Sequence, residues 1–301
     1  MNLRERPFLA PLSMFTNLPF RLLCQMYGAK GAVVPLVSAK AICLGKEPIE
    51  CLDPHPSEKF IGVQLFGNEP QVIGDAARIV ADRYPFIKFI DINCACPVRK
   101  VVVSGAGSAL LHSPEKVAQM IKAAGKSNMP VTVKLRKCAA VQKTLDFCKS
   151  CETAGAEALF IHGRSPSQGY SGEADWEIVS RIAHTVSIPV IGSGDIKSME
   201  QGERLCKAAG CASFMIGRAA LSDPEVFSSP ANATFERKKR LFMEYRQLCE
   251  DHGMVYLPDL RSKAIQLCNG FRNSAALRVK IGNSKSIEEL LSALSSTGTS
   301  H

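Results

Sequence analysis

The sequence predicts an eight-stranded (β/α) barrel of the TIM type, followed by a small all-helical domain. Between Phe8 and about Phe227, short apolar runs alternate eight times with helical patterns, as repeated βα units do. Almost every apolar run ends in a polar, glycine or cysteine-bearing segment. TIM barrels place their sites at the carboxyl ends of all eight strands, whereas doubly wound open sheets concentrate them at one switch point. From Thr234 onward only helical patterns are visible.

Each expected strand is a short apolar run bounded by polar or turn residues. The runs are Phe8–Leu12, Ala32–Val37, Phe60–Leu65, Phe89–Ile92, Val131–Leu135, Ala158–Ile161, Pro189–Ile191 and Ala212–Ile216. The segments that end them carry Ser13, Ser38, Gln64, Asn93 to Cys96, Lys134 to Arg136, His162 to Arg164, Gly192 to Asp195 and Gly217-Arg218. In a barrel these segments meet at one rim, which is where we expect the functional site.

Helix signals lie between the strands. The expected start signals are Asn17 before Leu18-Pro19, Ser113 before Pro114, and Ser198 before Met199; Gly28 and Gly210 mark helix ends, and an apolar stripe runs from Asp75 to Tyr84. Polar caps, proline in the first turn and glycine after the last turn are the usual boundaries of helices. The stretch from Ser38 to Pro56 fits this pattern poorly, so we expect a long or broken excursion there.

The domain boundaries follow from this alternation. Residues 1–230 are expected to form the barrel, 235–295 the helical domain, and 296–301 a disordered tail. The expected helices of the second domain are Phe235–Asp251, Leu260–Asn269, Ala275–Ile281 and Ile287–Leu294, separated by Gly253, Pro258, Gly270 and Gly282. Glycine and proline are the residues that most often interrupt helical patterns.

Composition and charge narrow the class of protein. The chain has 301 residues, 46% of them hydrophobic, and no apolar run approaches the ~20 residues that cross a bilayer. The N-terminus has no apolar segment typical of a secretory signal. We therefore expect a cytoplasmic protein, with no membrane association and no obligate protein partner evident. The net charge is +9, and residues 236–285 contain eleven Lys and Arg against five Asp and Glu, which favours a polyanionic partner.

The twelve cysteines are scattered through the chain, so we interpret them as reduced thiols rather than a disulfide framework. Cys94 and Cys96 supply only half of a tetrahedral metal site, and no second close pair of ligands follows a neighbouring strand. Cys148-x-x-Cys151 lies inside an expected helix with no strand before it, unlike a redox motif of the thioredoxin type. No metal is expected.

The polar strand ends predict a cofactor that carries a phosphate. Gly192-Ser193-Gly194-Asp195 and Gly217-Arg218 follow the last two strands, where TIM barrels commonly bind phosphate through backbone N–H groups. Each loop alone could equally be a tight turn. Lys134 could stabilise negative charge on a reduced flavin ring or simply be solvated, and Gln64 and His162 could bind a heteroaromatic ring or be structural. A thiol after the fourth strand could act as an acid, a nucleophile or a metal ligand.

Taken in order, these segments strongly resemble the tRNA-dihydrouridine synthases from about residue 8 to 227, with a weaker helical match beyond. The segments are Ala10-Pro11-Leu12-Ser13, Val63 to Gly67, Asp91-Ile92-Asn93 with Cys96-Pro97-Val98, Val131 to Arg136, His162-Gly163-Arg164, Tyr170 with Asp175-Trp176, Ile188 to Asp195, and Gly217-Arg218. The resemblance implies a flavin-binding TIM barrel, a helical RNA-binding domain, tRNA as the partner, and NADPH or NADH as the reductant.

The resemblance also implies roles for single residues. Those implied to bind FMN are Pro11, Leu12, Ser13, Gln64, Lys134, His162, Ser193, Gly194, Asp195, Gly217 and Arg218. Asn93, Arg136, Arg164 and Tyr170 are implied to lie near the substrate. In the implied reaction a hydride passes from flavin N5 to uracil C6, and Cys96 donates a proton to C5, for which a thiol of ordinary pKa is suited.

The sequence departs from the family pattern at five positions. Leu12 replaces the usual Met, Pro35 a common Glu, Ala95 the Gly before Cys96, Cys138 a Gly, and Ser193 an Asn. Two other functions stay open. A dihydroorotate or dihydropyrimidine dehydrogenase would act on free pyrimidines and would not need the basic helical domain. An RNA-binding protein with a degenerate barrel would not be expected to retain Lys134 and Cys96.

Overall fold

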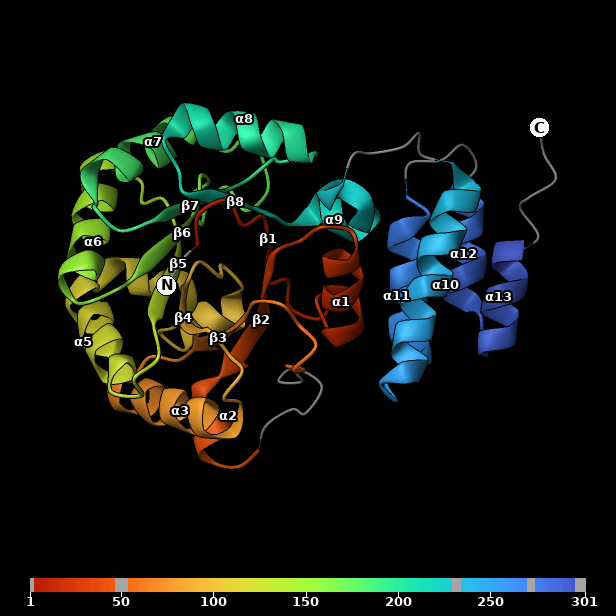
Figure 1. Cartoon of the computed structure of the whole chain (residues 1–301), viewed down its shortest axis with the longest axis horizontal. Helices are drawn as coiled ribbons and strands as arrows, with labels where there is room; N and C mark the ends of the chain where they lie inside the picture. Colours follow the sequence, from red (N-terminus) through yellow and green to blue (C-terminus); the bar gives the residue numbers. More distant parts are fainter. Residues whose placement is uncertain (1–2, 47–53, 229–233, 270–273, 296–301) are drawn as a thin grey trace.

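A computed structural model describes residues 3–46, 54–228, 234–269 and 274–295 (Figure 1). Eight parallel strands form a closed barrel in chain order. The strands are β1 (Phe8–Leu9), β2 (Gly31–Ser38), β3 (Ile61–Phe66), β4 (Phe89–Cys94), β5 (Val131–Arg136), β6 (Ala158–His162), β7 (Val190–Ser193) and β8 (Ser213–Ile216). Strand β1 pairs with both β2 and β8, which closes the barrel. The predicted TIM barrel is confirmed.

All eight expected strands are present, but the expected first strand is too long. After Leu9 the Ala10 N–H still donates to the carbonyl of Ile216 at 2.8 Å. Pro11 has no N–H with which to continue the ladder. The chain then turns, and the side chain of Thr16 both donates to and accepts from the backbone of Leu12. Residues Pro11 to Phe15 therefore form a loop above the barrel.

The helices of the barrel follow most of the predicted signals. They are α1 (Leu18–Met26), α2 (Ala39–Cys43), α3 (Pro70–Arg83), α4 (Arg99–Val103), α5 (Pro114–Gly125), α6 (Val141–Thr153), α7 (Trp176–Thr185), α8 (Met199–Ala209) and α9 (Arg218–Ser222). The side chains of Asn17 and Ser198 cap α1 and α8. Helix α3 begins at Pro70, before the expected Asp75, because proline is well suited to a first turn. The excursion after β2 contains the short α2, and its residues 47–53 lie outside the described residues.

The amino-terminal end of the barrel is filled by aromatic rings. Phe8 makes edge-on contacts with Phe60, Phe89 and Phe160, with ring centroids 5.3–6.4 Å apart. A Cβ atom at Gly62 would lie 2.3 Å from the ring of Phe89, so the ring occupies the space that a larger residue would need. Because these rings fill the barrel interior at this end, the interior is free to open only at the carboxyl ends of the strands.

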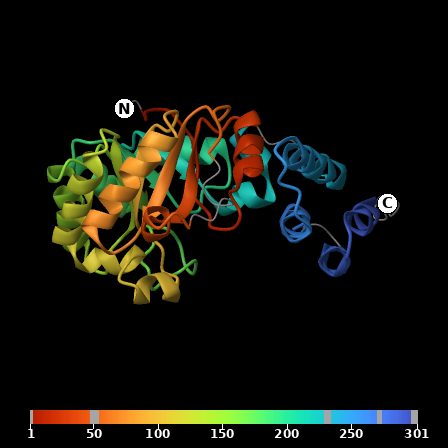
Figure 2. The same cartoon turned by 90° about the horizontal axis from the view of Figure 1, so that it is seen from below.

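The second domain lies beside the barrel, next to α1 (Figures 1 and 2). Its helices are α10 (Phe235–Asp251), α11 (Leu257–Leu267), α12 (Ser274–Asn283) and α13 (Ile287–Ser295). Pro258 does not separate helices as predicted; it lies in the first turn of α11, where its missing N–H costs nothing. The expected boundary at 230 and the tail 296–301 lie outside the described residues. None of the described helices is long and apolar enough to cross a membrane.

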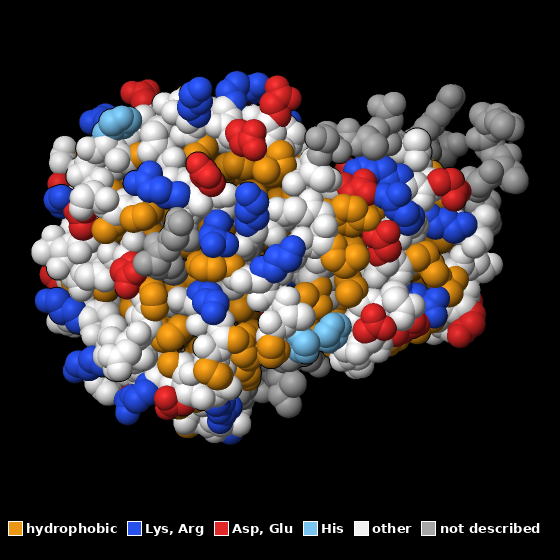
Figure 3. Space-filling view, in the orientation of Figure 1, with side chains coloured by type: hydrophobic (Ala, Val, Ile, Leu, Met, Phe, Trp, Pro, Cys, Tyr) orange, Lys and Arg blue, Asp and Glu red, His pale blue; other side chains and the backbone are white. Residues whose placement is uncertain are grey.

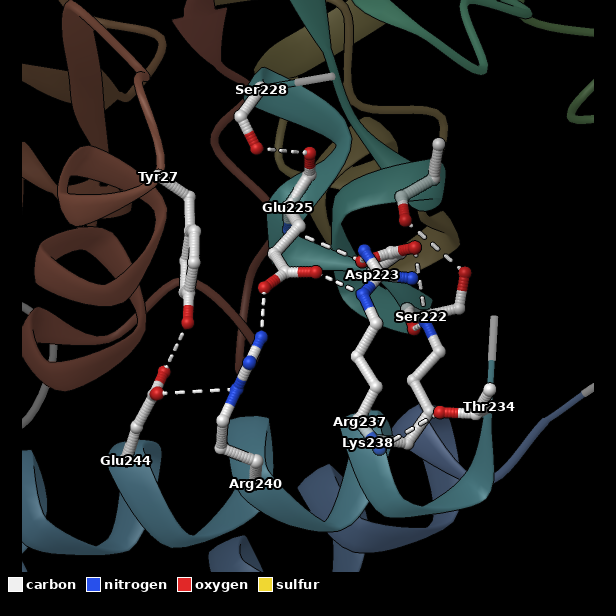
Figure 4. Close-up of polar contacts among 11 residues, drawn as sticks. Tyr27, Ser222, Asp223, Glu225, Ser228, Thr234, Arg237, Lys238, Arg240 and Glu244 are labelled. Carbon is white, nitrogen blue, oxygen red and sulfur yellow. Dashed lines mark hydrogen bonds and ion pairs between the residues drawn. The ribbon is translucent and has the colours of Figure 1, made fainter. Parts of the chain in front are cut away.

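The basic run at the start of α10 faces the barrel (Figure 4). Arg237 pairs with Asp223 at 3.0 Å and with Glu225, and Lys238 donates to the carbonyl of Ser222 at 2.6 Å. Both basic side chains are buried. They belong to a network, here called the domain clamp, formed by Tyr27, Ser222, Asp223, Glu225, Arg237, Lys238, Arg240 and Glu244.

The domain clamp corrects one expectation from the sequence. Arg237 and Lys238 belong to the basic residues of 236–285 that were counted as favouring a polyanionic partner, but both are buried against acidic residues of this chain. Lys263 is also buried. Its ammonium donates to the carbonyl of Phe15 at 2.8 Å and lies over the ring of Phe20. Arg272, another basic residue of the segment 236–285, lies outside the described residues. At the same junction the rings of His55 and His252 meet with centroids 4.8 Å apart, and Figure 3 shows histidine side chains there.

Candidate active site

A cavity of about 870 Å³ opens at the carboxyl ends of the strands. Every residue expected to bind cofactor or substrate lines it: Pro11, Leu12, Ser13, Gln64, Asn93, Cys96, Lys134, Arg136, His162, Arg164, Tyr170, Ser193, Gly194, Asp195, Gly217 and Arg218. The structure therefore brings together residues that are spread over seven of the eight βα units. Their individual roles stay predictions.

The strand register places these side chains in adjoining rows. Gln64 lies opposite Asp91, Asn93 opposite Lys134, and Arg136 opposite His162. Residues two apart in a strand point to the same side, so Asp91 and Asn93 both point into the barrel, one layer apart. The sequence thus produces a polar layer simply by placing polar residues at alternate positions near the strand ends.

The floor of the cavity is a buried chain of hydrogen bonds. Thr132 donates to Asp91 at 2.7 Å, Gln64 donates to the same carboxylate at 2.7 Å, and Asn93 donates to Gln64 Oε1 at 2.6 Å. Gln64, Asp91 and Asn93 are nearly inaccessible to solvent. Each amide therefore has a fixed orientation, because its donor and acceptor atoms are assigned by the neighbour on either side.

Asn93 also determines where the two nearby thiols point. Its Oδ1 accepts from the backbone N–H groups of Ala95 and Cys96, at 3.1 and 3.0 Å. These bonds turn the chain as soon as β4 ends at Cys94. Cys94 stays buried in the core with 0% exposure, whereas Cys96 is half-buried and lines the cavity. The position of Cys96 agrees with its expected role as proton donor, and Cys94 is a core residue.

Lys134 presents a buried ammonium group to the cavity. Burial lowers the pKa of Lys134 to about 8, although Asp91 acts in the opposite direction. Burial likewise raises the pKa of Asp91 to about 6, against the hydrogen bonds from Gln64 and Thr132. Among the described residues, none accepts a hydrogen bond from the Lys134 ammonium. A buried ammonium without a partner favours a ligand that offers it an acceptor or a negative charge.

His162 is held neutral beside that lysine. Burial, followed by the charges of Lys134, Arg136 and Arg164, lowers the pKa of His162 to about 2. Its Nδ1 accepts from the backbone N–H of Arg164 at 3.2 Å, so the ring proton resides on Nε2. A neutral imidazole with this tautomer offers one donor to a bound ring.

Asp195 fixes two arginines at one side of the cavity. It has a left-handed backbone, with φ of 56°, and directly follows Gly194, whose φ is 123°. Its carboxylate pairs with Arg164 at 2.7 Å and with Arg218 at 3.2 Å. Burial acts to raise the pKa of Asp195, but the bonds from Arg164 and Ala174 outweigh it and the pKa is lowered. The two arginines are thus fixed by one carboxylate.

Tyr170 lines the cavity close to two guanidinium groups. The Arg218 guanidinium lies 4.3 Å and the Arg136 guanidinium 5.6 Å from the centre of its ring. The ring is 54% exposed. Arg136 is anchored in turn by the carbonyls of Ser165 and Gly169, at 3.1 and 2.8 Å. An exposed aromatic ring at the mouth of a cavity is suited to stack on a planar ligand.

The sequence did not identify Leu36 as part of the site. The pairing of β2 with β3 shifts register between Val34 and Val37, because Pro35 cannot donate to the ladder. Leu36 lies in this bulge with φ of 38° and lines the cavity. Bulges often re-aim a side chain near an active site. The family's usual carboxylate at position 35 is therefore replaced here by an apolar wall. Phe15, Ser222, Asp223 and Val226 also line the cavity unexpectedly.

No metal centre is found in the part of the chain that the structure describes. No group of three or more His, Cys, Asp or Glu side chains there could hold a metal ion. Cys148 and Cys151 lie on α6 and are buried, as expected for a helical pair.

Comparison with known proteins agrees with this geometry. The profile described as dihydrouridine synthase matches residues 8–299. The chain is 29% identical over 299 residues to a probable tRNA-dihydrouridine synthase of Aquifex aeolicus, which covers 94% of this chain and 93% of that protein. It is 36% identical over 233 residues to tRNA-dihydrouridine synthase B of Pseudomonas putida, which covers 75% of this chain and 67% of that protein.

A solved structure supports the fold alone. A variant of NCR from Zymomonas mobilis superposes with a TM-score of 0.53 over 80% of this chain and 87% of that chain, at 13% identity. The family is shown instead by the profile, which spans both the barrel and the helical domain. The chain belongs to the dihydrouridine synthase family.

Proposed function

We propose that this protein reduces uridine to 5,6-dihydrouridine in tRNA, with FMN as its cofactor and NADPH or NADH as the reductant, in the cytoplasm. The observation that carries the proposal is one cavity containing both a half-buried thiol, Cys96, and a buried ammonium without an acceptor, Lys134. The relatives described as tRNA-dihydrouridine synthases support the choice of substrate.

The residues present fit a flavin mononucleotide. Its ring would lie against Lys134, Gln64 and the Nε2–H of His162, and its phosphate against the turns at Gly194 and Gly217. Arg164 Nη1 is buried without a hydrogen-bond partner, which is consistent with a further polar group binding there. No strand–GxGxxG–helix fingerprint of a dinucleotide site occurs in the sequence, which favours FMN over FAD. When bound, the reduced flavin supplies the hydride.

The protein's own residues supply the rest of the reaction. Cys96 holds a proton that its thiol delivers to C5 of the uracil ring. Asn93 keeps that thiol at the cavity by binding the backbone of Ala95 and Cys96. Arg136 and Tyr170 at the mouth position the base and its phosphate. General acids of this kind typically contribute ~10²- to 10⁴-fold in rate.

A uridine must leave its stack to enter such a cavity, which costs a few kcal/mol and is cheapest in a loop. Basic side chains of the second domain, among them the half-buried Lys239 and the exposed Lys280, would then hold the tRNA backbone. A dehydrogenase of free pyrimidines would need neither an unstacked base nor basic side chains on a second domain.

The test is a reconstituted assay. The purified protein should be yellow and release FMN on denaturation, and with NADPH it should form dihydrouridine in tRNA that lacks this modification. Arg218→Ala should weaken FMN retention, since the phosphate loses a charge-assisted contact. A colourless protein that takes up no FMN would overturn the cofactor. Reduction of free uracil or orotate, with tRNA left unchanged, would overturn the substrate and identify a pyrimidine dehydrogenase.

A further inference from the structure

Helix α8 ends in a motif that brings two cysteines together. Gly210 adopts the left-handed conformation with φ of 71°, Cys211 N–H donates to the Cys206 carbonyl at 3.0 Å, and Gly210 N–H donates to the Lys207 carbonyl at 3.3 Å. These two backbone hydrogen bonds define the Schellman motif, in which the side chains at the positions of Cys206 and Cys211 commonly touch. The contact is usually apolar; here it joins two thiols.

The two thiols are in direct contact and open to small molecules. The Cys206 thiol donates to the Cys211 carbonyl at 3.2 Å, and the two side chains are within hydrogen-bonding range of each other. Both are half-buried. They line a second cavity, of about 410 Å³, whose wall includes Glu5, Lys30 and Lys207. This cavity lies at the amino-terminal end of the barrel, away from the candidate active site.

The pair is chemically asymmetric. Once Cys206 has lost its proton, the Cys211 thiol donates to it, which lowers the pKa of Cys206 and raises that of Cys211. Thiolates rather than thiols attack disulfides. Cys206 is therefore the better nucleophile. Cys211 stays protonated while Cys206 is a thiolate.

We propose that Cys206 and Cys211 form a thiol-modification site that reacts with low-molecular-weight disulfides and ends as an internal disulfide. The Cys206 thiolate attacks one sulfur of oxidised glutathione, forming a mixed disulfide and releasing glutathione thiolate. Cys211 then gives up its proton, attacks Cys206 Sγ and releases the second glutathione. Two protein thiols are oxidised and one small disulfide is reduced to two thiols. A dithiol such as dithiothreitol reverses both steps.

Two observations favour this chemistry over a metal. No third His, Cys, Asp or Glu joins the pair among the residues with described positions, whereas structural zinc needs four ligands. The backbone hydrogen bond from Cys211 to Cys206 and the contact of the Cys206 thiol with the Cys211 carbonyl already hold the two residues side by side. The site makes no use of the active-site cavity, so the proposal stands apart from the proposed function.

The experiment exposes the full-length protein to oxidised glutathione and then alkylates, digests with trypsin and analyses it by mass spectrometry. Cleavage after Arg204, Lys207 and Arg218 separates the two cysteines. The proposal expects a cross-link between peptides 205–207 and 208–218, with loss of both alkylation sites and their return after dithiothreitol. Cys148 and Cys151, closer in sequence but buried, are the internal control and should stay unlinked.

Two variants test the assigned roles. In Cys211→Ser, Cys206 should retain glutathione as a stable mixed disulfide, because the second attack is lost. In Cys206→Ser, Cys211 should take up none. Full alkylation of both cysteines after treatment, or equal cross-linking of Cys148 with Cys151, would overturn the site. Retention of glutathione by Cys211 in Cys206→Ser would overturn the order of the two steps.

Discussion

At the scale of single residues, the two thiols at the end of β4 differ in kind because Asn93 turns the chain between them. In an extended strand Cys94 and Cys96 would point to the same side, so the alternation of side chains alone could not separate them. The Asn93 side chain binds the backbone of residues 95 and 96, so only Cys96 reaches the cavity. That turn depends on hydrogen bonds to one amide oxygen, so the periodicity of apolar residues in the sequence could not predict it.

We predict that Cys96→Ala abolishes turnover of uridine while leaving the flavin half-reaction with NADPH intact. Loss of a general acid removes ~10²- to 10⁴-fold in rate. The matched variant Cys94→Ala should retain activity within about tenfold and lose stability instead, because it leaves a small space in the core. Rapid-reaction measurements of flavin reduction, and of its reoxidation by tRNA, separate the two effects. The reverse outcome would mean that Cys94 is the acid.

Asp91 gives a prediction about pH. Its pKa is raised to about 6 in the folded protein from an ordinary 3.8, so between these values the folded state binds more protons than the unfolded state. By linkage, the free energy of unfolding then falls as pH rises through this window, by ~3 kcal/mol in total. Asp91→Asn keeps an acceptor for Gln64 and removes the titrating group. Relative to the wild type, this variant should therefore gain stability between pH 4 and pH 7.

Urea unfolding at a series of pH values measures this difference. Asp82→Asn, at an exposed position on α3, is the control and should follow the wild type throughout. If the free energy of unfolding of Asp91→Asn varied with pH in parallel with that of the wild type, the buried carboxyl would not titrate in this range.

At the scale of elements, the ends of strands were predictable and the bulge in β2 was not. Residues such as Gln64, Lys134 and His162 interrupt apolar runs at the same relative position, and a barrel necessarily gathers such positions at one rim. Leu36 enters the cavity only because Pro35 breaks the ladder and reverses the sign of the next φ. The apolar pattern is the same with or without the bulge.

Charge was the least reliable guide at this scale. The run from Arg237 to Arg240 counts as four positive charges in the sequence, but Arg237, Lys238 and Arg240 pair with acidic residues of the domain clamp. Those partners, Asp223 and Glu225, precede α10 by a stretch whose path the sequence does not reveal. A count of charges cannot distinguish a charge that meets solvent from one that meets a carboxylate.

We predict that Lys239 and Arg237 have separable roles. Lys239 is half-buried and makes no ion pair among the described residues, so Lys239→Gln should reduce the slope of log K for tRNA against log salt by about one. Arg237→Gln should leave that slope unchanged. It should instead destabilise the protein by ~1.5–3 kcal/mol, since Arg237 loses its charged hydrogen bonds while Asp223 keeps Lys238 and Glu225 keeps Arg240. Binding titrations at several salt concentrations measure the slope, and urea unfolding measures the stability. A reduced slope for Arg237→Gln would show that Arg237 contacts the tRNA.

At the scale of the whole molecule, the helical domain supports two loops that line the candidate active site. Lys263 holds the carbonyl of Phe15, and Arg237 holds Asp223; Phe15 and Asp223 both line the cavity. Tyr245 of α10 packs edge-on against Phe20 of α1, with ring centroids 6.3 Å apart. The domain that was predicted to bind RNA therefore also supports two loops of the cavity.

We predict that a chain ending at Ser228 binds FMN more weakly than the full chain and unfolds at a lower temperature. Removal of α10 and α11 takes away the partners of Phe15 and Asp223 and uncovers the apolar face of α1. Fluorescence titration with FMN and calorimetry measure the two losses. The intact protein should give a single calorimetric transition, because the interface is buried and polar contacts cross it. Two resolved transitions, together with unchanged FMN affinity, would show that the domains are independent.

The closure of the barrel has a consequence for how the chain is made. The ladder between β1 and β8 joins Phe8 to Met215, so nearly the whole barrel must leave the ribosome before that ladder can form. Contacts so distant in sequence are slow to form and raise the contact order of the fold. Until then β1 has only β2 beside it, and its other edge offers unpaired backbone groups to any passing strand. The first strand to be synthesised is thus the last to gain its second neighbour.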